Sequence, residues 1–162
     1  MTDKATRTLP ILGEAGVDAW AALLRVHAAL VPRMDRELLR ATGTSLSQYD
    51  VLLELYTSDD QRLRMAELAQ RTVVSRSRVS RIVDELTDQG LTVRQADPGD
   101  GRAAYAVLTD AGRTALRAAW PTYRDAIIRL VGGPLGDDAT VVAEALRRVL
   151  ECRPISSETH HA

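Results

Sequence analysis

The stretch "SRSRVSRIVDELTDQG", from Ser75 to Gly90, combines apolar residues at helical spacing with a graded charge. At about 100° per residue, four of its apolar side chains share one face of a helix. They are Val79, Ile82, Val83 and Leu86. Gly90 suits the left-handed residue that commonly follows a helix. The stretch therefore predicts a helix over 75–89 that packs its apolar face inward.

The opposite face of this predicted helix carries serines and arginines. Exposed side chains are expected at Ser77, Ser80, Arg81 and Asp84, with Arg76 and Arg78 on the two flanks. The arginines stand in the first half, where free N–H groups and the helix dipole also favour anions. A solvated face with ion pairs from Arg81 to Asp84 or Glu85 is the alternative interpretation.

The surrounding sequence concentrates positive charge in the same place. Between Gln61 and Arg81 there are six arginines and one glutamate, a net charge of +5, whereas the whole chain carries −1. All but one of the basic residues are arginines, which fork bidentately to phosphate. Such an asymmetry is typical of a phosphate-binding surface.

The composition is that of an ordinary globular protein, with 162 residues, 45% apolar and 27% charged. This length suits one domain, or one domain with extra helices for assembly. A single cysteine, Cys152, excludes an internal disulfide and a multi-cysteine zinc site. No run approaches the roughly 18 consecutive apolar residues of a membrane span, and the first residues do not resemble a signal peptide. We therefore expect a cytoplasmic protein with no membrane partner.

Patterns of catalysis and metal binding do not occur in the sequence. It has no nucleophile elbow, and its few histidines are not arranged with acids. His160 and His161 do not form a metal site by themselves, and the position of Cys152 does not favour a thiol sensor. The sequence predicts no enzyme, no cofactor and no metal.

Helical spacing recurs on both sides of the 75–90 stretch. Helices are predicted from Gly16 to Gly43 with Pro32 inside, over 45–60 with Ser45 or Ser47 as N-cap, over 64–72, over 109–133 with Thr109 or Asp110 as N-cap, and over 136–153. Two alternating runs, 91–97 and 102–110, are joined by "PGDG" and predict a β-hairpin.

These elements indicate a mostly α fold with a small β-hairpin wing. A short helix, the turn "TVV" and a second helix match a helix-turn-helix, whose second helix enters the major groove of DNA. Arg102 lies just past the wing tip, within reach of a minor groove or phosphate. Apolar surface left on the terminal helices indicates a partner. The predicted domains are a flexible tail (1–13), an N-terminal dimerisation helix (14–44), a winged helix-turn-helix DNA-binding lobe (45–110), C-terminal dimerisation helices (111–152) and a second tail (153–162).

Three strings resemble the MarR (multiple antibiotic resistance regulator) family of winged-helix transcription factors. They are "LSQYDVLLEL", "LRMAELAQRTVVSRSRVSRIVDELTDQGLTVRQ" and "DPGDGRAAYAVLTDAGR", which together span about 46–113. The resemblance implies a homodimer with interlocked terminal helices and two winged lobes on a near-palindromic operator in double-stranded DNA. Family members are mostly repressors, and many release DNA when a small phenolic or other ligand binds between the dimer helices and the lobe.

The resemblance also assigns residues to DNA. It places Ser75, Arg76, Ser77, Arg78, Ser80 and Arg81 against DNA, and Arg62 and Arg64 at the start of the preceding helix, within reach of phosphate. At the wing, Asp97 and Arg102 match the family pattern, but Gly99 replaces its middle arginine. Either Arg102 takes over the minor-groove contact, or the wing contributes mainly backbone contacts. Asp97 is expected to orient Arg102 or Arg94.

The resemblance further suggests an effector pocket for a small aromatic or phenolic ligand. Its candidate residues are Trp20, His27, Tyr49, Asp50 and Arg64. For Asp50 with Arg64, we favour a structural ion pair between the second and third helices. For Trp20 and His27, we favour packing in the core or in a dimer. The alternative function is a winged-helix interaction module, or adaptor, that does not bind an operator and would not need the basic 75–89 helix.

Overall fold

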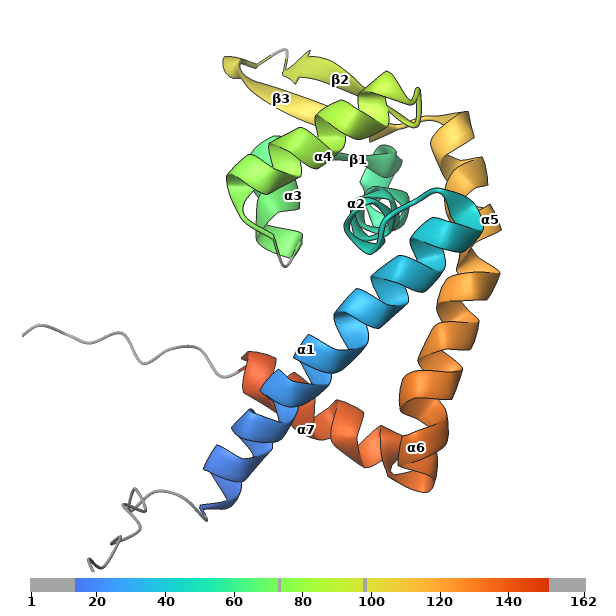
Figure 1. Cartoon of the computed structure of the whole chain (residues 1–162). Helices are drawn as coiled ribbons and strands as arrows, with labels where there is room; N and C mark the ends of the chain where they lie inside the picture. Colours follow the sequence, from blue (N-terminus) through green and yellow to red (C-terminus); the bar gives the residue numbers. More distant parts are fainter. Residues whose placement is uncertain (1–13, 73, 98, 152–162) are drawn as a thin grey trace, which may run out of the picture. The chain divides into compact units, whose positions relative to one another are not determined.

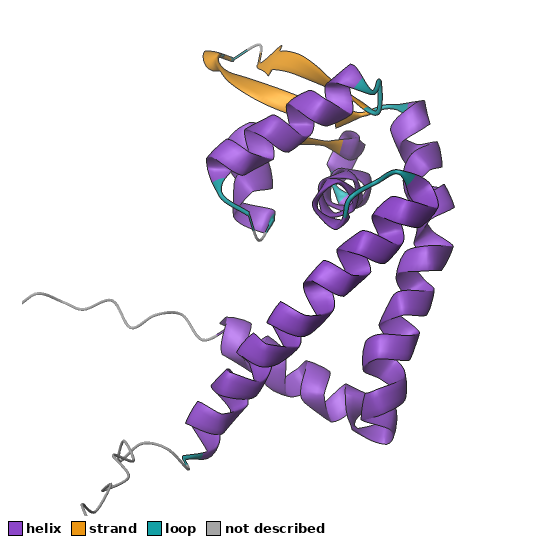
Figure 2. Cartoon of the chain, in the orientation of Figure 1, coloured by secondary structure: helices purple, strands orange, loops and turns teal. Residues whose placement is uncertain are grey.

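A computed structural model describes residues 14–72, 74–97 and 99–151, with residues 100–102 described for the backbone only. The helices and strands are α1 (Ala15–Thr42), α2 (Leu46–Thr57), β1 (Arg62–Arg64), α3 (Met65–Arg71), α4 (Arg76–Asp88), β2 (Thr92–Asp97), β3 (Asp100–Leu108), α5 (Asp110–Ile127), α6 (Gly133–Leu135) and α7 (Ala139–Glu151). A π-helical turn over Ile128–Gly132 and a 3₁₀ turn over Gly136–Asp138 flank α6. The predicted fold class, mostly α with a small wing, is confirmed (Figure 2). Both predicted tails, which include His160 and His161, lie outside the described residues, and so does Cys152.

Helix boundaries follow the local signals in the sequence. Helix α1 continues through Pro32 and ends at Gly43, which adopts the left-handed φ of 74°. Helix α2 begins after Ser45, so the cap is this serine and not Ser47. The Gln48 N–H donates to Ser45 Oγ (3.2 Å), and the Ser45 N–H donates to Gln48 Oε1 (3.0 Å). This capping box satisfies two N–H groups that would otherwise lack partners.

The sheet has three strands in the order β1-β3-β2, so the predicted two-stranded hairpin was incomplete. Strand β1 pairs antiparallel with β3, with Leu63 opposite Ala106. Arg62 and Arg64 were predicted to begin the third helix. This was wrong for Arg62, which lies in β1, whereas Arg64 is both the last residue of β1 and the N-cap of α3. The physical reason is the pairing with β3, which holds this segment extended, so that Leu63 is buried in the core and its two neighbours lie outside.

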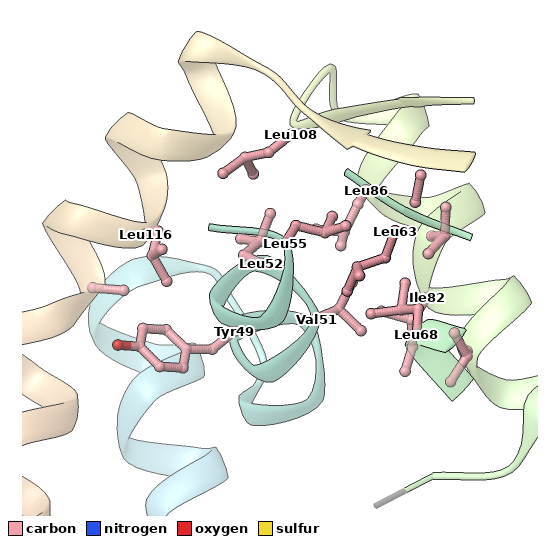
Figure 3. Packing of buried hydrophobic residues seen from close by; sticks show 14 of the residues in the cluster. Tyr49, Val51, Leu52, Leu55, Leu63, Leu68, Ile82, Leu86, Leu108 and Leu116 are labelled. Carbon is pink, nitrogen blue, oxygen red and sulfur yellow. The ribbon is translucent and has the colours of Figure 1, made fainter. Parts of the chain in front are cut away.

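One hydrophobic core holds the winged lobe together, and helix α2 runs through its middle (Figure 3). The inward face of α4 is as predicted, since Val79, Ile82, Val83 and Leu86 are all buried. Burying each such side chain stabilises the fold by roughly 1.5–3 kcal/mol. This apolar anchor holds α4 on the lobe and leaves its opposite face outside (Figure 1).

The start of α5 is fixed against the turn that joins α4 to the wing. Thr109 caps α5, because its Oγ1 accepts the Gly112 N–H (3.0 Å), and its own N–H donates to Leu91 O (3.1 Å). A Cβ at Gly112 would lie 2.2 Å from Leu91 O, so only glycine allows this approach. These contacts fix the start of α5 to the turn at the base of the wing.

The chain divides into two compact units, one ending at Arg124 and the other beginning at Asp125. The terminal helices carry large apolar side chains that remain exposed. They include Trp20, Leu23, Leu24 and Val26 on α1, and Val141, Leu146, Val149 and Leu150 on α7. Among the described residues, no helix combines the length and hydropathy needed to cross a membrane.

Candidate nucleic-acid interface

The outer face of α4 presents three arginines at its N-terminal half. Arg76, Arg78 and Arg81 are all exposed, and none of them has an ion-pair partner among the described residues. The pairs considered for Arg81, with Asp84 or Glu85, are therefore not formed. Ser75 and Ser77 lie beside them, with their hydroxyl oxygens 3.3 Å apart. This surface offers free guanidinium groups to an anion.

The other three arginines of the basic 61–81 segment are paired. Arg62 lies 3.5 Å from Asp60, Arg64 lies 2.5 Å from Asp97, and Arg71 lies 2.6 Å from Glu67. The local surplus of positive charge is thus reduced near β1 and α3. It remains on α4.

Arg64 joins strand β1 to the end of strand β2 through Asp97. The Asp97 side chain is only 6% exposed, and its Oδ1 accepts the Gly99 N–H (2.9 Å). Its Oδ2 contacts Arg64 ionically, without hydrogen-bond geometry. Arg64 Nε also donates to the Tyr105 hydroxyl (3.1 Å). The hydrogen bond to Tyr105, followed by the charge of Asp97, raises the pKa of Arg64, which stays protonated.

Two expectations about these residues need correction. Asp97 was expected to orient Arg102 or Arg94. The Arg94 alternative was wrong, because Arg94 binds Asp84 and the partner of Asp97 among the described residues is Arg64, whereas the Arg102 alternative stays a prediction. Arg64 was expected to pair with Asp50, and no such pair forms. The reason is that β1 pairs with β3, which brings Arg64 next to Tyr105 and the wing. The side chain of Arg102 lies outside the described residues.

Arg94 connects the wing to the outer face of α4. Its Nε donates to Asp84 Oδ1 (3.0 Å), and its Nη2 donates to the Ser80 hydroxyl (3.0 Å) and the Ser80 carbonyl (3.2 Å). Ser80 is half-buried, whereas Ser77 is exposed. The structure therefore ties Ser80, a predicted DNA-facing residue, to the wing.

A polar hollow of about 420 Å³ lies between α1, α2 and α4. It is lined by Asp35, Ser45, Ser47, Ser77, Arg78, Arg81, Ile82 and Glu85. Sequence reasoning missed the α1 and α2 members of this set. Their only signal was the capping sequence at Ser45, which predicts a helix start but not a neighbour on α4.

A second, apolar pocket of about 280 Å³ lies between α2 and α5. It is lined by Tyr49, Leu53, Tyr56, Leu116, Arg117 and Trp120. Of the five predicted ligand residues, only Tyr49 lines it. The guanidinium of Arg117 lies over the Tyr56 ring, 6.0 Å from its centroid. The pocket combines aromatic walls with one cation.

The other predicted ligand residues lie elsewhere. Trp20 is 60% exposed and His27 is exposed, so neither packs in the core of a single chain. Asp50 is half-buried, and burial, followed by the charge of Glu54, raises its pKa to about 6. Burial, followed by the charge of Tyr123, raises the pKa of Tyr49 to about 12. Both groups hold their protons more tightly than free side chains do.

Comparison with known proteins agrees with this geometry. Residues 42–103 match the model of the MarR family. The chain is 28% identical over 138 residues to the HTH-type transcriptional regulator YkoM of Bacillus subtilis, covering 83% of this chain and 88% of YkoM. It is 23% identical over 136 residues to the regulator MhqR of the same organism, covering 84% of this chain and 92% of MhqR.

Two solved structures from Streptomyces coelicolor are similar over nearly the whole chain. AbsC, a MarR family transcriptional regulator, has a TM-score of 0.75 and 28% identity, covering 90% of this chain and 97% of AbsC. Sco3205, a MarR family transcriptional regulator solved in complex with DNA, has a TM-score of 0.77 and 30% identity, covering 90% of this chain and 92% of Sco3205. The chain therefore belongs to the MarR family and is a DNA-binding transcriptional regulator.

Proposed function

We propose that this protein is a ligand-responsive repressor that binds a near-palindromic operator as a homodimer, with α4 of each copy in the major groove. The observation that carries this proposal is the set of three exposed arginines at the N-terminal half of α4, for which no ion-pair partner is found in the part of the chain that the structure describes. An adaptor without operator binding would have no use for them. We propose a cytoplasmic location, because a regulator must reach its operator in the DNA.

The proposed DNA contacts divide by chemistry. Arginines contact phosphates, or guanine edges bidentately, so Arg76, Arg78 and Arg81 are the main contacts. Ser75 and Ser77 add hydrogen bonds at the same end of α4. Ser80 is also proposed to contact DNA, with its hydroxyl held in place by the hydrogen bond from Arg94.

The wing and β1 supply the outer contacts. Arg62 and Arg64 have about half of their side chains exposed (45% and 53%) and are proposed as phosphate contacts. Arg102, near the tip of the wing, is proposed to reach the neighbouring minor groove. Since Arg64 is already in an ion pair with the buried Asp97, we expect it to contribute less to DNA affinity than Arg62 does.

The DNA proposal is tested by selecting duplexes from a random pool with the wild-type protein. Gel-shift titrations then measure affinity at several salt concentrations. Affinity should fall steeply with salt, because arginines displace counterions from phosphates. Selected sites should show half-sites about one helical turn apart. If no duplex is enriched and no salt-sensitive binding appears, the adaptor becomes the better proposal.

Dimerisation is supported by the exposed apolar side chains of α1 and α7. Trp20, Leu24 and Val149 are respectively 60%, 49% and 67% exposed, and burying them against a second copy would stabilise a dimer. Light scattering at micromolar concentration should give the mass of two chains. Leu24→Asp should shift this mass to one chain, whereas Arg25→Asp, which changes a neighbouring charged residue, is the control. A wild-type monomer would reject the dimer.

The response to a ligand is supported by the pocket between α2 and α5. Its aromatic walls suit a flat ring, and Arg117 at the same site suits an acidic group on that ring. In Trp20→Phe, Trp120 is the only tryptophan left to report on this pocket. Titration with phenolic acids should change its fluorescence and weaken DNA binding at the same concentrations. A fluorescence change without release of DNA would show that the pocket binds the ligand but does not regulate DNA binding.

A further inference from the structure

Gln48 connects the first turn of α2 to α4, the helix that we propose enters the major groove. It is 8% exposed, so both ends of its amide need partners inside the protein. Its Oε1 accepts the Ser45 N–H as part of the capping box. Its Nε2 donates to Glu85 Oε2 (3.2 Å), a residue 37 positions further along the chain.

Helix α1 reaches the same turn of α2. Asp35 Oδ1 accepts the Leu46 N–H (2.8 Å), next to the capping box that contains Gln48. The side chains of Asp35 and Glu85 both line the polar hollow beside Arg78 and Arg81. Three helices therefore meet through directional contacts at the first turn of α2.

A second contact holds α4 from the side of the wing. Arg94 of β2 binds Asp84, the residue just before Glu85. Adjacent residues on a helix point about 100° apart, so the two acids are held from different directions. The acidic half of α4 thus does more than balance the arginines of the other half, because each of these two acids has a partner on another element.

The apolar face of α4 does not fix the roll of this helix by itself. Hydrophobic contacts are non-directional, whereas hydrogen bonds weaken steeply when their angle changes. The Gln48–Glu85 and Arg94–Asp84 contacts therefore restrict rotation of α4 about its axis. Such a rotation would change where the arginines at its other end point.

We propose that Gln48 is a positioning residue for DNA recognition, which sets the roll of α4 through Glu85 and so directs Arg78 and Arg81 toward DNA. This inference rests on the proposed function, since it concerns how α4 meets an operator. Gln48 itself lies beneath the surface and needs no contact with DNA.

The test separates the two roles of Gln48, in the cap and in the contact to α4. In Gln48→Glu, the introduced carboxylate still accepts the Ser45 N–H, as glutamate does in many capping boxes. It also faces the carboxylate of Glu85, and the two repel each other. In the double variant Gln48→Glu/Glu85→Gln, the introduced amide donates to the introduced carboxylate, which restores the hydrogen bond in the opposite sense. Glu85→Gln alone keeps an acceptor for Gln48 and is the matched control.

Two measurements are made on each full-length variant. Fluorescence anisotropy gives the affinity for a duplex selected from a random pool by the wild-type protein, and for an unrelated duplex. Amide hydrogen exchange without DNA reports the protection of residues 80–89. Gln48→Glu should bind the selected duplex about tenfold more weakly, with faster exchange in α4, since neighbouring polar groups couple by amounts of this order. The double variant should recover both properties, and Glu85→Gln should change neither.

Other results would contradict the proposed role of Gln48 or the proposed operator binding. Wild-type affinity and exchange in Gln48→Glu overturn the inference. So does a loss of helical signal that the double variant does not regain, because Gln48 would then be needed for α2 alone. If the wild-type protein selects no duplex, the proposed operator binding fails. In that case, unchanged exchange in Gln48→Glu rejects the contact as a restraint on α4, and faster exchange that the double variant reverses supports it.

Discussion

The six arginines of the basic segment belong to two regions that look alike in sequence and differ in the folded protein. On α4, Arg76, Arg78 and Arg81 are exposed and have no ion-pair partner among the described residues. On β1 and α3, Arg62, Arg64 and Arg71 each lie within 3.5 Å of a carboxylate oxygen. The first group is available to a phosphate, whereas the second is already partly neutralised.

The difference teaches that a count of charges is not a count of binding groups. An exposed ion pair adds little to stability, often less than about 1 kcal/mol, but it does reduce the local field. Arg64 shows a further effect, because its partner Asp97 is buried and holds it at the wing. We therefore expect the two groups to respond differently to substitution, as follows.

The largest effect is expected from replacing the unpaired group. The triple variant Arg76→Ala/Arg78→Ala/Arg81→Ala should lose about 100-fold or more in DNA affinity. The slope of log affinity against log salt concentration should become shallower by about three, because about three fewer counterions are released. Its urea unfolding midpoint should stay close to that of the wild type, because these side chains point away from the core. A comparable loss of stability would show that the group is structural and would remove the contrast.

Asp50 offers the converse case, a carboxylate that is half-buried and has no cation partner among the described residues. Its pKa is about 6 in the folded protein, against 3.8 for an ordinary aspartate exposed to water. The protonated form is therefore favoured by folding. The free energy of unfolding should therefore fall as pH rises from about 4 to about 6, by about 2 kcal/mol from this group.

Replacing Asp50 checks this sign directly. Asp50→Asn should be more stable than the wild type above pH 6, and this advantage should disappear toward pH 4. Urea unfolding of both proteins across this range measures the difference, and Asp59→Asn, at an exposed site, serves as the control. A variant that is less stable at every pH would mean that the charge has a favourable partner.

A smaller effect is expected from separating Arg64 from the wing. Asp97→Asn removes the buried charge and leaves Arg64 free to face solvent, at a cost of about 1 kcal/mol in unfolding free energy. Affinity for the selected duplex should fall severalfold because the wing is held less firmly. Tighter binding of the variant would indicate that Asp97 mainly masks Arg64.

The smallest effect is expected from Arg71, whose partner Glu67 lies one turn away on the same short helix. Arg71→Ala should change the unfolding free energy by less than about 0.5 kcal/mol and DNA affinity by less than about twofold. Anisotropy and urea titrations on the same preparations measure both. An effect as large as that of one α4 arginine would place Arg71 in the interface and break the division into two groups.

The chain order of elements and the inward face of α4 were predictable from local patterns. Periodicity located Val79 and Leu86, and the capping residues Ser45 and Gly43 located helix ends. Strand β1 was missed because three residues are too few to show a period. It exists only because β3 offers Leu63 and its neighbours a free edge.

For the candidate site, local pattern predicted which side of α4 faces outward, because helix geometry depends on neighbours in sequence. It did not predict the partners of Arg64 and Arg94, or the link from Gln48 to Glu85. Those contacts join residues 10 to 41 positions apart. Their formation depends on which elements pack together. The tertiary structure alone therefore decides which of the described charges are paired and which contacts hold α4 in place.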